Sequence, residues 1–258
     1  MNFDIPYLPE REKKPRNEGI TMMMDKGLSL REAENFVSSG SEFTDVVKFG
    51  FGTALFTKNL KEKIKVYREG NLRPYFGGTL FEAFILRGLF DDYRRMIDKF
   101  NLDLAEISDG SMIIPHPEKL EYVKKLSEQV TVLSEVGSKQ ADVVFPPDMW
   151  VSMMKTELEA GAWKVIAEAR ESGTIGIYNP DGSANIELID DIIKHVKIEN
   201  VLWEAPNKGQ QVWFIKLLGA NVNLGNIAPA EVVSLEALRL GLRGDTFFEF
   251  LPKEMKKY

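Results

Sequence analysis

Short apolar or β-branched runs alternate along this chain with amphipathic stretches. The apolar runs lie at residues 21–24, 43–49, 72–76, 103–107, 130–133, 163–167, 201–203 and 221–224. Runs of this length, bounded by polar residues, are typical of buried strands. Between them, apolar residues recur at three-and-four spacing, as in Ile189, Ile192, Ile193 and Val196, which places an apolar stripe on one helix face. The pattern predicts eight successive β-α units.

Helix start signals agree with this division. Ser29 with Glu32, and Thr79 with Glu82, have the spacing of capping boxes, and Pro117 suits the first turn of a helix. Eight parallel strands with crossover helices in 258 residues favour a closed (β/α)8 TIM barrel over an open doubly wound sheet. We therefore expect one α/β barrel domain over residues 19–258. Residues 1–18 form an N-terminal extension that is either mobile or involved in assembly.

Composition and charge exclude several classes of protein. The chain is 44% apolar and 28% charged, as expected of a folded globular domain, and it has no cysteine, which excludes disulfides, thiolate metal sites and cysteine nucleophiles. A net charge of −6 gives no general attraction to nucleic acid or to an anionic membrane. No apolar run approaches the roughly 20 residues that span a bilayer, and no signal peptide is evident. These features predict a cytoplasmic protein.

Acidic residues follow several of the predicted strands. In a TIM barrel the carboxyl ends of the strands meet at one rim, where catalytic groups lie. Buried carboxylates are costly there unless they are paired or bound to a metal, so their number indicates a cation. With oxygen ligands only, Mg²⁺ is the natural candidate. The acidic residues are Asp25, Asp109, Glu135, Glu168 and Glu204.

Glycines at the same strand ends allow a ligand to approach the backbone closely and suit a phosphate. Gly50 and Gly52 lack the third glycine of a dinucleotide-binding motif, and no phosphate-binding P-loop motif occurs in the chain. The sequence therefore gives no indication of NAD binding or of a P-loop nucleotide site.

The strand-end motifs resemble those of the phosphosulfolactate synthase family of coenzyme M biosynthesis. Nine motifs carry the resemblance, in order, over residues 16–248: TMMMDKG, DVVKFGFGT, FGGTLFE, EISDGS, SEVGSK, EARESG, EAPNKGQQVWFI, VNLGNIA and SLEALRLGLRGDTF. The resemblance implies a Mg²⁺-dependent barrel enzyme that adds sulfite to phosphoenolpyruvate, giving (2R)-2-O-phospho-3-sulfolactate. It also favours a homo-oligomer, such as a trimer.

That chemistry assigns expected roles to residues of this chain. The metal would be held by Glu135, Asp109 and Glu168, because the carboxylate of the substrate gains negative charge during the reaction. The expected catalytic residues are Lys48 as first choice of proton donor, Lys26 as second choice, and Arg170. The expected substrate-binding residues are Asp25, Gly78, Ser108, Lys139, Glu204, Asn223, Asn226 and Arg243.

Two alternatives stay open at this point. A related lyase could keep the barrel and the metal but use another enolpyruvate-type substrate. The family also includes proteins that resemble plant heat-stress-associated proteins, so a non-catalytic stress-associated or assembly role on the same barrel is the other alternative. One departure concerns the motif around Lys139: some family members carry a lysine directly after Glu-Val-Gly, whereas here Ser138 intervenes.

Overall fold

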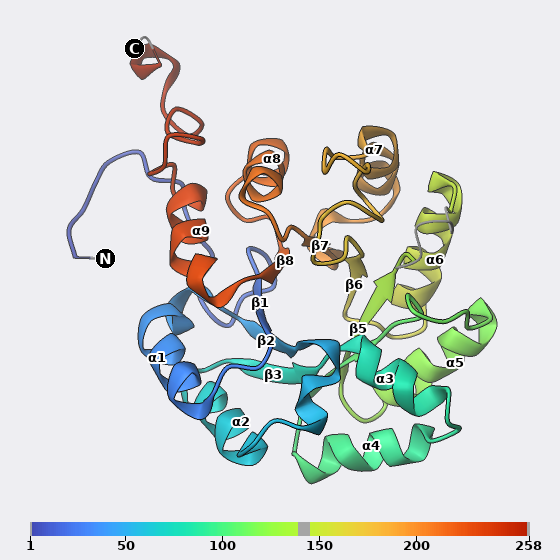
Figure 1. The fold of residues 1–258 in the computed structure, drawn as a ribbon. Helices are drawn as coiled ribbons and strands as arrows, with labels where there is room; N and C mark the ends of the chain where they lie inside the picture. Colours follow the sequence, from blue (N-terminus) through green and yellow to red (C-terminus); the bar gives the residue numbers. More distant parts are fainter. Residues whose placement is uncertain (1, 139–144, 257–258) are drawn as a thin grey trace.

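The computed structural model describes residues 2–138 and 145–256, and it confirms the single (β/α)8 TIM barrel. Eight parallel strands form the centre and helices surround them (Figure 1). The strands are β1 (Thr21–Asp25), β2 (Val46–Phe49), β3 (Arg73–Phe76), β4 (Leu104–Ile107), β5 (Thr131–Val136), β6 (Lys164–Ala167), β7 (Val201–Glu204) and β8 (Leu224–Ile227). Seven of these overlap the predicted runs closely, whereas β8 begins where its predicted run ends.

The α-helices follow the strands in the order expected for this fold, with two helices between β3 and β4. They are α1 (Leu30–Gly40), α2 (Leu60–Glu69), α3 (Gly78–Ile85), α4 (Phe90–Lys99), α5 (His116–Ser127), α6 (Pro147–Glu159), α7 (Ile186–His195), α8 (Lys208–Leu218) and α9 (Val232–Arg239). Short 3₁₀ helices are η1 (Ser41–Phe43), η2 (Gly50–Leu55), η3 (Ile198–Asn200), η4 (Pro229–Glu231) and η5 (Lys253–Met255). Within the described part of the chain, no helix has the length and apolar character needed to cross a bilayer.

One seam of the barrel is closed by side chains. Parallel ladders join the strands in the order β3-β2-β1-β8-β7-β6-β5-β4, and among the described residues no ladder joins β3 to β4. Across this seam the Arg73 guanidinium donates to the Asp103 carboxylate at 2.8 Å and to its carbonyl oxygen at 3.1 Å. Further along the strands, the Tyr75 hydroxyl donates to Glu106 Oε2 at 3.1 Å. Side-chain hydrogen bonds thus replace the missing ladder.

The barrel interior is filled in layers. Because side chains alternate along a strand, every second residue faces the barrel axis. One apolar layer consists of Ile20, Met22, Val46, Tyr75, Leu104, Leu133, Ile166 and Leu202, all fully or almost fully buried. Two residues further along five of these strands come Lys48, Glu106, Glu135, Glu168 and Glu204. The alternation therefore places a charged layer directly above an apolar one, at the carboxyl ends of the strands.

The predicted helix starts have mixed outcomes. The capping box of Ser29 with Glu32 at the start of α1 is confirmed, since both of its hydrogen bonds are present. The predicted capping box of Thr79 with Glu82 is wrong, because α3 begins after Gly77 without a side-chain cap. Glu82 is buried instead and accepts hydrogen bonds from the loop after β4. Tertiary contacts with that loop override the local capping preference.

The described part of the N-terminal extension contacts the opposite end of the barrel, where the strands begin. Arg11 forms an ion pair with Glu236 of α9 at 2.9 Å, and Arg16 forms one with Asp45 at 2.9 Å. Asn17 Oδ1 accepts hydrogen bonds from the Trp163 indole N–H at 3.1 Å and from the ammonium of Lys164 at 3.0 Å. The segment around residues 11–17 is therefore held against the barrel.

Candidate metal and substrate site

A cavity of about 380 Å³ opens at the carboxyl ends of the strands. TIM-barrel enzymes carry their active sites at this end, where the loops after the strands converge. The cavity floor belongs to the charged layer of the barrel, and the loops after β2, β3, β4 and β6 contribute to its walls. It is lined by Met24, Lys48, Phe51, Gly77, Thr79, Ser111, Glu135, Glu168, Arg170, Glu171, Ser172, Glu204 and Asn226.

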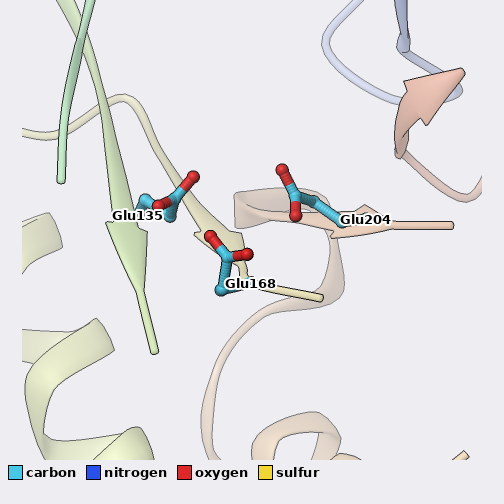
Figure 2. A group of neighbouring side chains, drawn as sticks. All are labelled: Glu135, Glu168 and Glu204. Atoms are coloured by element: carbon cyan, nitrogen blue, oxygen red, sulfur yellow. The ribbon is translucent and has the colours of Figure 1, made fainter. Parts of the chain in front are cut away.

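Three buried glutamates of this cavity come from three adjacent strand ends. Glu135 is on β5, Glu168 follows β6, and Glu204 ends β7. Each offers one carboxylate oxygen, and these three oxygens lie within 4.8 Å of one another. Figure 2 shows the three side chains reaching into one common space. The turn after β6 fixes two of them, because Arg170 N donates to Glu168 Oε1 at 2.6 Å and Ala169 N donates to Glu204 Oε2 at 3.0 Å.

The Lys48 ammonium lies among the glutamates of the charged layer. Its Nζ is 2.9 Å from Glu106 Oε1, and the side chain is almost completely buried. The same Nζ is 3.3 Å from Glu135 Oε2 and 3.5 Å from Glu204 Oε1. An ammonium has three N–H donors, and here three carboxylates surround it. Lys48 therefore compensates part of the negative charge that the barrel buries.

Burial and neighbouring charges shift the pKa values of Lys48 and Glu204. Burial acts to lower the pKa of Lys48, but the charges of its three glutamate partners outweigh burial and raise the pKa well above its usual value. Burial also raises the pKa of Glu204 to about 7, against the opposing effect of Lys48 and with a further rise caused by Glu135. Three carboxylates surround one ammonium, so Lys48 offsets only part of the effect that burial and the neighbouring carboxylates have on the pKa of Glu204.

Glu106 is held from the β3 side of the barrel. The backbone N–H of Gly78 donates to Glu106 Oε1 at 2.5 Å, at the start of α3. A Cβ on Gly78 would lie 2.5 Å from the Ser108 Cβ, so only glycine allows this approach. Ser108 in turn donates to Glu82 Oε1, and Ser111 N donates to Glu82 Oε2 at 2.8 Å. Glu82 therefore shapes the loop that carries Ser111 to the cavity wall.

Two further groups are available to a ligand. The side-chain oxygen of Asn226 is buried and, among the described residues, has no hydrogen-bond partner. Asn226 adopts a left-handed backbone, with φ of 57°, at an irregularity where β8 slips in register against β1. Such a bulge re-aims a side chain, here toward the cavity. Arg170, also left-handed with φ of 52°, is exposed on the cavity wall.

These residues fit a divalent cation. A hard ion such as Mg²⁺ prefers oxygen ligands, and it tolerates a site made of few carboxylates because it keeps several waters. Glu135, Glu168 and Glu204 supply such oxygens within reach of one ion, and the unpartnered Asn226 oxygen lines the same cavity. The cation would also offset the excess of negative charge around Lys48.

Comparison with known proteins places the chain in a family. A profile of (2R)-phospho-3-sulfolactate synthase (ComA) matches residues 9–245. The chain belongs to the (2R)-phospho-3-sulfolactate synthase family. A phosphosulfolactate synthase of Bacillus subtilis is 42% identical over 251 residues, covering 96% of this chain and all of that relative. This confirms the resemblance found in the sequence motifs and identifies the chain as a member of an enzyme family.

More distant similarities complete the picture. The protein HEAT-STRESS-ASSOCIATED 32 of Arabidopsis thaliana is 24% identical over 261 residues, covering 89% of this chain and 88% of that protein. Among solved structures, the 3-hexulose-6-phosphate synthase of Salmonella typhimurium superposes with a TM-score of 0.56 at 13% identity, covering 87% of this chain and all of that one. At this identity the structural similarity indicates the shared barrel fold alone.

Six of the site residues expected from the resemblance to the phosphosulfolactate synthase family line the cavity. They are Lys48, Glu135, Glu168, Arg170, Glu204 and Asn226. Gly78 and Ser108 lie buried beside it, around Glu106 and Glu82. Lys26 lies at the rim, where its ammonium is 3.2 Å from Glu171 and 5.5 Å from the centre of the Phe51 ring. Lys139 lies outside the described residues.

The remaining expected residues lie elsewhere. Asp109, an expected metal ligand, accepts a hydrogen bond from Lys119 at 2.8 Å and is not part of the glutamate cluster. The third member of that cluster is Glu204. Asp25 is buried against α2, where it contacts Lys63. Asn223 precedes β8 and bonds to the backbone at the opposite end of the barrel, and Arg243 follows α9, outside the cavity lining.

Several residues that shape the site are not among those expected from the sequence. Glu106 lies in the EISDGS motif, and strand alternation directs it toward the pocket on the same face as Ser108, but no role is assigned to it from the sequence. Glu82 and Lys119 are on helices, and their contacts with the strand-end loops cross long stretches of sequence. No local pattern indicates such contacts.

Proposed function

We propose that this protein is a carbon-sulfur lyase, a phosphosulfolactate synthase that adds sulfite to C3 of phosphoenolpyruvate in a Mg²⁺-dependent reaction. The observation that carries the proposal is the cluster of Glu135, Glu168 and Glu204 on the cavity floor of a chain that belongs to this family. The product would be (2R)-2-O-phospho-3-sulfolactate, and the proposed setting is cytoplasmic.

The reaction needs charge compensation and one proton. The sulfur lone pair of sulfite forms a bond to C3, the C2–C3 double-bond electrons move onto the carboxylate, and C2 then takes a proton while the phosphate ester is retained. Bound Mg²⁺, held by the three glutamates, would supply Lewis-acid stabilisation of the charge that builds on the carboxylate. Both reactants are anions, and the floor of the cavity is itself acidic. A cation is therefore required before they can approach.

The residues of the chain would divide the remaining tasks. Arg170 is exposed on the cavity wall, where its guanidinium can bind the phosphate or the sulfonate through paired N–H groups. The Asn226 amide would orient the substrate from the β8 side. Lys48, surrounded by carboxylates, serves as the counter-ion that holds the glutamates in place rather than as the proton donor. The proton would come from the rim, where Lys26 lies.

The direct test supplies purified protein with phosphoenolpyruvate, sulfite and MgCl₂ and follows the phosphorus resonance by NMR. Conversion of the enol phosphate into phosphosulfolactate, lost on chelation by EDTA and in Glu135→Gln, is the expected result. Absence of the product would reject the proposal. Turnover of another enolpyruvate-type substrate would then indicate a related lyase, and no turnover at all would favour the non-catalytic stress-associated or assembly role on the same barrel.

A further inference from the structure

A buried lysine lies directly outside the strand that carries Glu135. Lys119 of α5 is only 1% exposed, and its ammonium contacts acceptors from three separate parts of the fold. It donates to Asp109 Oδ1 in the loop after β4 at 2.8 Å and to the Glu135 carbonyl oxygen at 2.6 Å. It also forms an ion pair with Glu157 of α6, with Nζ 2.9 Å from Oε1. Three acceptors match the three N–H donors of an ammonium.

The contact with the Glu135 carbonyl oxygen lies at the end of the β4–β5 ladder. The last residues in register on these strands are Ile107 and Ser134. The Glu135 carbonyl therefore lies one residue beyond the last pair of the β4–β5 ladder. Lys119 supplies a hydrogen bond to the main chain at this point. The side chain of the same residue points the other way, into the barrel toward Lys48.

The ammonium is charged in this setting. Burial acts to lower the pKa of Lys119, but the charges of Glu157 and Asp109 outweigh burial and raise it. Hydrogen bonds from a charged donor are about twice as strong as neutral ones. Lys119 therefore ties the end of β5, the loop after β4 and helix α6 together through one buried charge.

We infer that Lys119 is a positioning residue for the candidate metal centre, fixing the main chain from which the Glu135 carboxylate projects. This inference rests on the proposed function, since it assumes that Glu135 is a metal ligand. Groups behind a ligand set its orientation, and their loss weakens metal affinity by about 10–100-fold. Lys119 does not touch the cavity and so takes no direct part in the chemistry.

The test measures Mn²⁺ binding to the full chain by calorimetry and needs no turnover. In Lys119→Met we expect the dissociation constant for Mn²⁺ to rise by about 10–100-fold. The double variant Lys119→Met with Glu157→Gln also removes the carboxylate that loses its Lys119 partner. We expect it to fold, and we expect its Mn²⁺ affinity to stay weak because the Lys119 hydrogen bond to the Glu135 carbonyl is still absent. Faster amide exchange around Val136 in both variants is the accompanying structural readout.

The matched control is Lys63→Met, which removes an equally buried lysine from an ion pair with Asp25 at the end of β1. It should lose stability but bind Mn²⁺ within about twofold of wild type. A folded Lys119 variant that also binds Mn²⁺ within twofold would overturn the inference, as would a wild-type protein that binds neither Mn²⁺ nor Mg²⁺. Wild-type protein that binds Mn²⁺ but forms no phosphosulfolactate would reject the proposed reaction, and weakened Mn²⁺ binding in the variants would still support the role of Lys119.

Discussion

Replacing Lys48 by methionine tests the electrostatics of the charged layer. The substitution keeps most of the side-chain volume and leaves three carboxylates around an uncharged group, at positions that were 2.9, 3.3 and 3.5 Å from the ammonium. Each such contact is worth roughly 5 kcal/mol of gross attraction at an effective dielectric constant of about 20, and the lost hydration of the ions offsets most of it. Loss of one partner from a buried ion pair lowers the free energy of unfolding by about 3–5 kcal/mol, and we expect Lys48→Met to be destabilised by that amount at pH 8.

The loss of stability in Lys48→Met should be larger at high pH than at low pH. Lys48 opposes the raised pKa of Glu204, so without the ammonium the folded-state pKa of Glu204 should lie further above its unfolded value, and the repulsion is fully present at high pH. It fades as pH falls through the folded pKa and Glu204 takes up a proton. Glu204, whose pKa is about 7 even with Lys48 present, is expected to protonate first. The destabilisation at pH 5.5 should therefore be smaller than at pH 8.

Urea unfolding followed by tryptophan fluorescence measures both values. As a control, Lys48→Met combined with Glu106→Gln removes the nearest carboxylate as well, and it should regain at least about 1 kcal/mol if the two residues are coupled. Wild-type stability of Lys48→Met at pH 8, or an equal loss at both pH values, would refute the counter-ion role.

Three further predictions concern two residues of the cavity and one lysine at the opposite end of the barrel. Glu168→Gln should raise the dissociation constant for Mn²⁺ by roughly 10-fold or more, because the site loses one charged ligand; unchanged affinity in calorimetry would exclude Glu168 as a ligand. Arg170→Ala should raise the KM for phosphoenolpyruvate by about 10–100-fold, as expected for a lost charge-assisted contact of roughly 1.5–3 kcal/mol, with Mn²⁺ affinity unchanged; a normal KM would contradict its role. Burial lowers the pKa of Lys164 to about 8, so wild-type protein should gain roughly 1–2 kcal/mol of stability, allowing for solvent screening, as pH rises from about 8 to 10. Lys164→Met should lack this gain, and equal slopes of unfolding free energy against pH in the two proteins would disprove it.

The fold was predictable because most strands and helices show their hydrophobic period within their own short stretch of sequence. The exception is β8, which was predicted at residues 221–224 and begins at Leu224. Gly225 and Asn226 have turn-like propensity, yet both are strand residues, and Asn226 adopts a left-handed backbone. A strand over residues 221–224 would place Asn223 near its carboxyl end, at the catalytic rim. Because β8 begins at Leu224, Asn223 precedes the strand and lies at the opposite end of the barrel.

The site was predictable only as far as strand alternation extends. Lys48, Glu135, Glu168 and Glu204 follow their strands' inward set and meet as expected. Asp25 belongs to the outward set of β1, because Met22 and Met24 face inward, and so it pairs with a helix. Asp109 lies beyond the end of β4, where alternation no longer applies. Its partner Lys119 could not be inferred from the local sequence.

The central claim is that Glu135, Glu168 and Glu204 hold one divalent cation on the floor of the cavity. Anomalous diffraction from crystals of the protein grown with Mn²⁺ tests it most directly. We predict a single strong anomalous peak within about 2.3 Å of a carboxylate oxygen from each of the three glutamates. A peak at another position, or none at saturating Mn²⁺, would contradict the account.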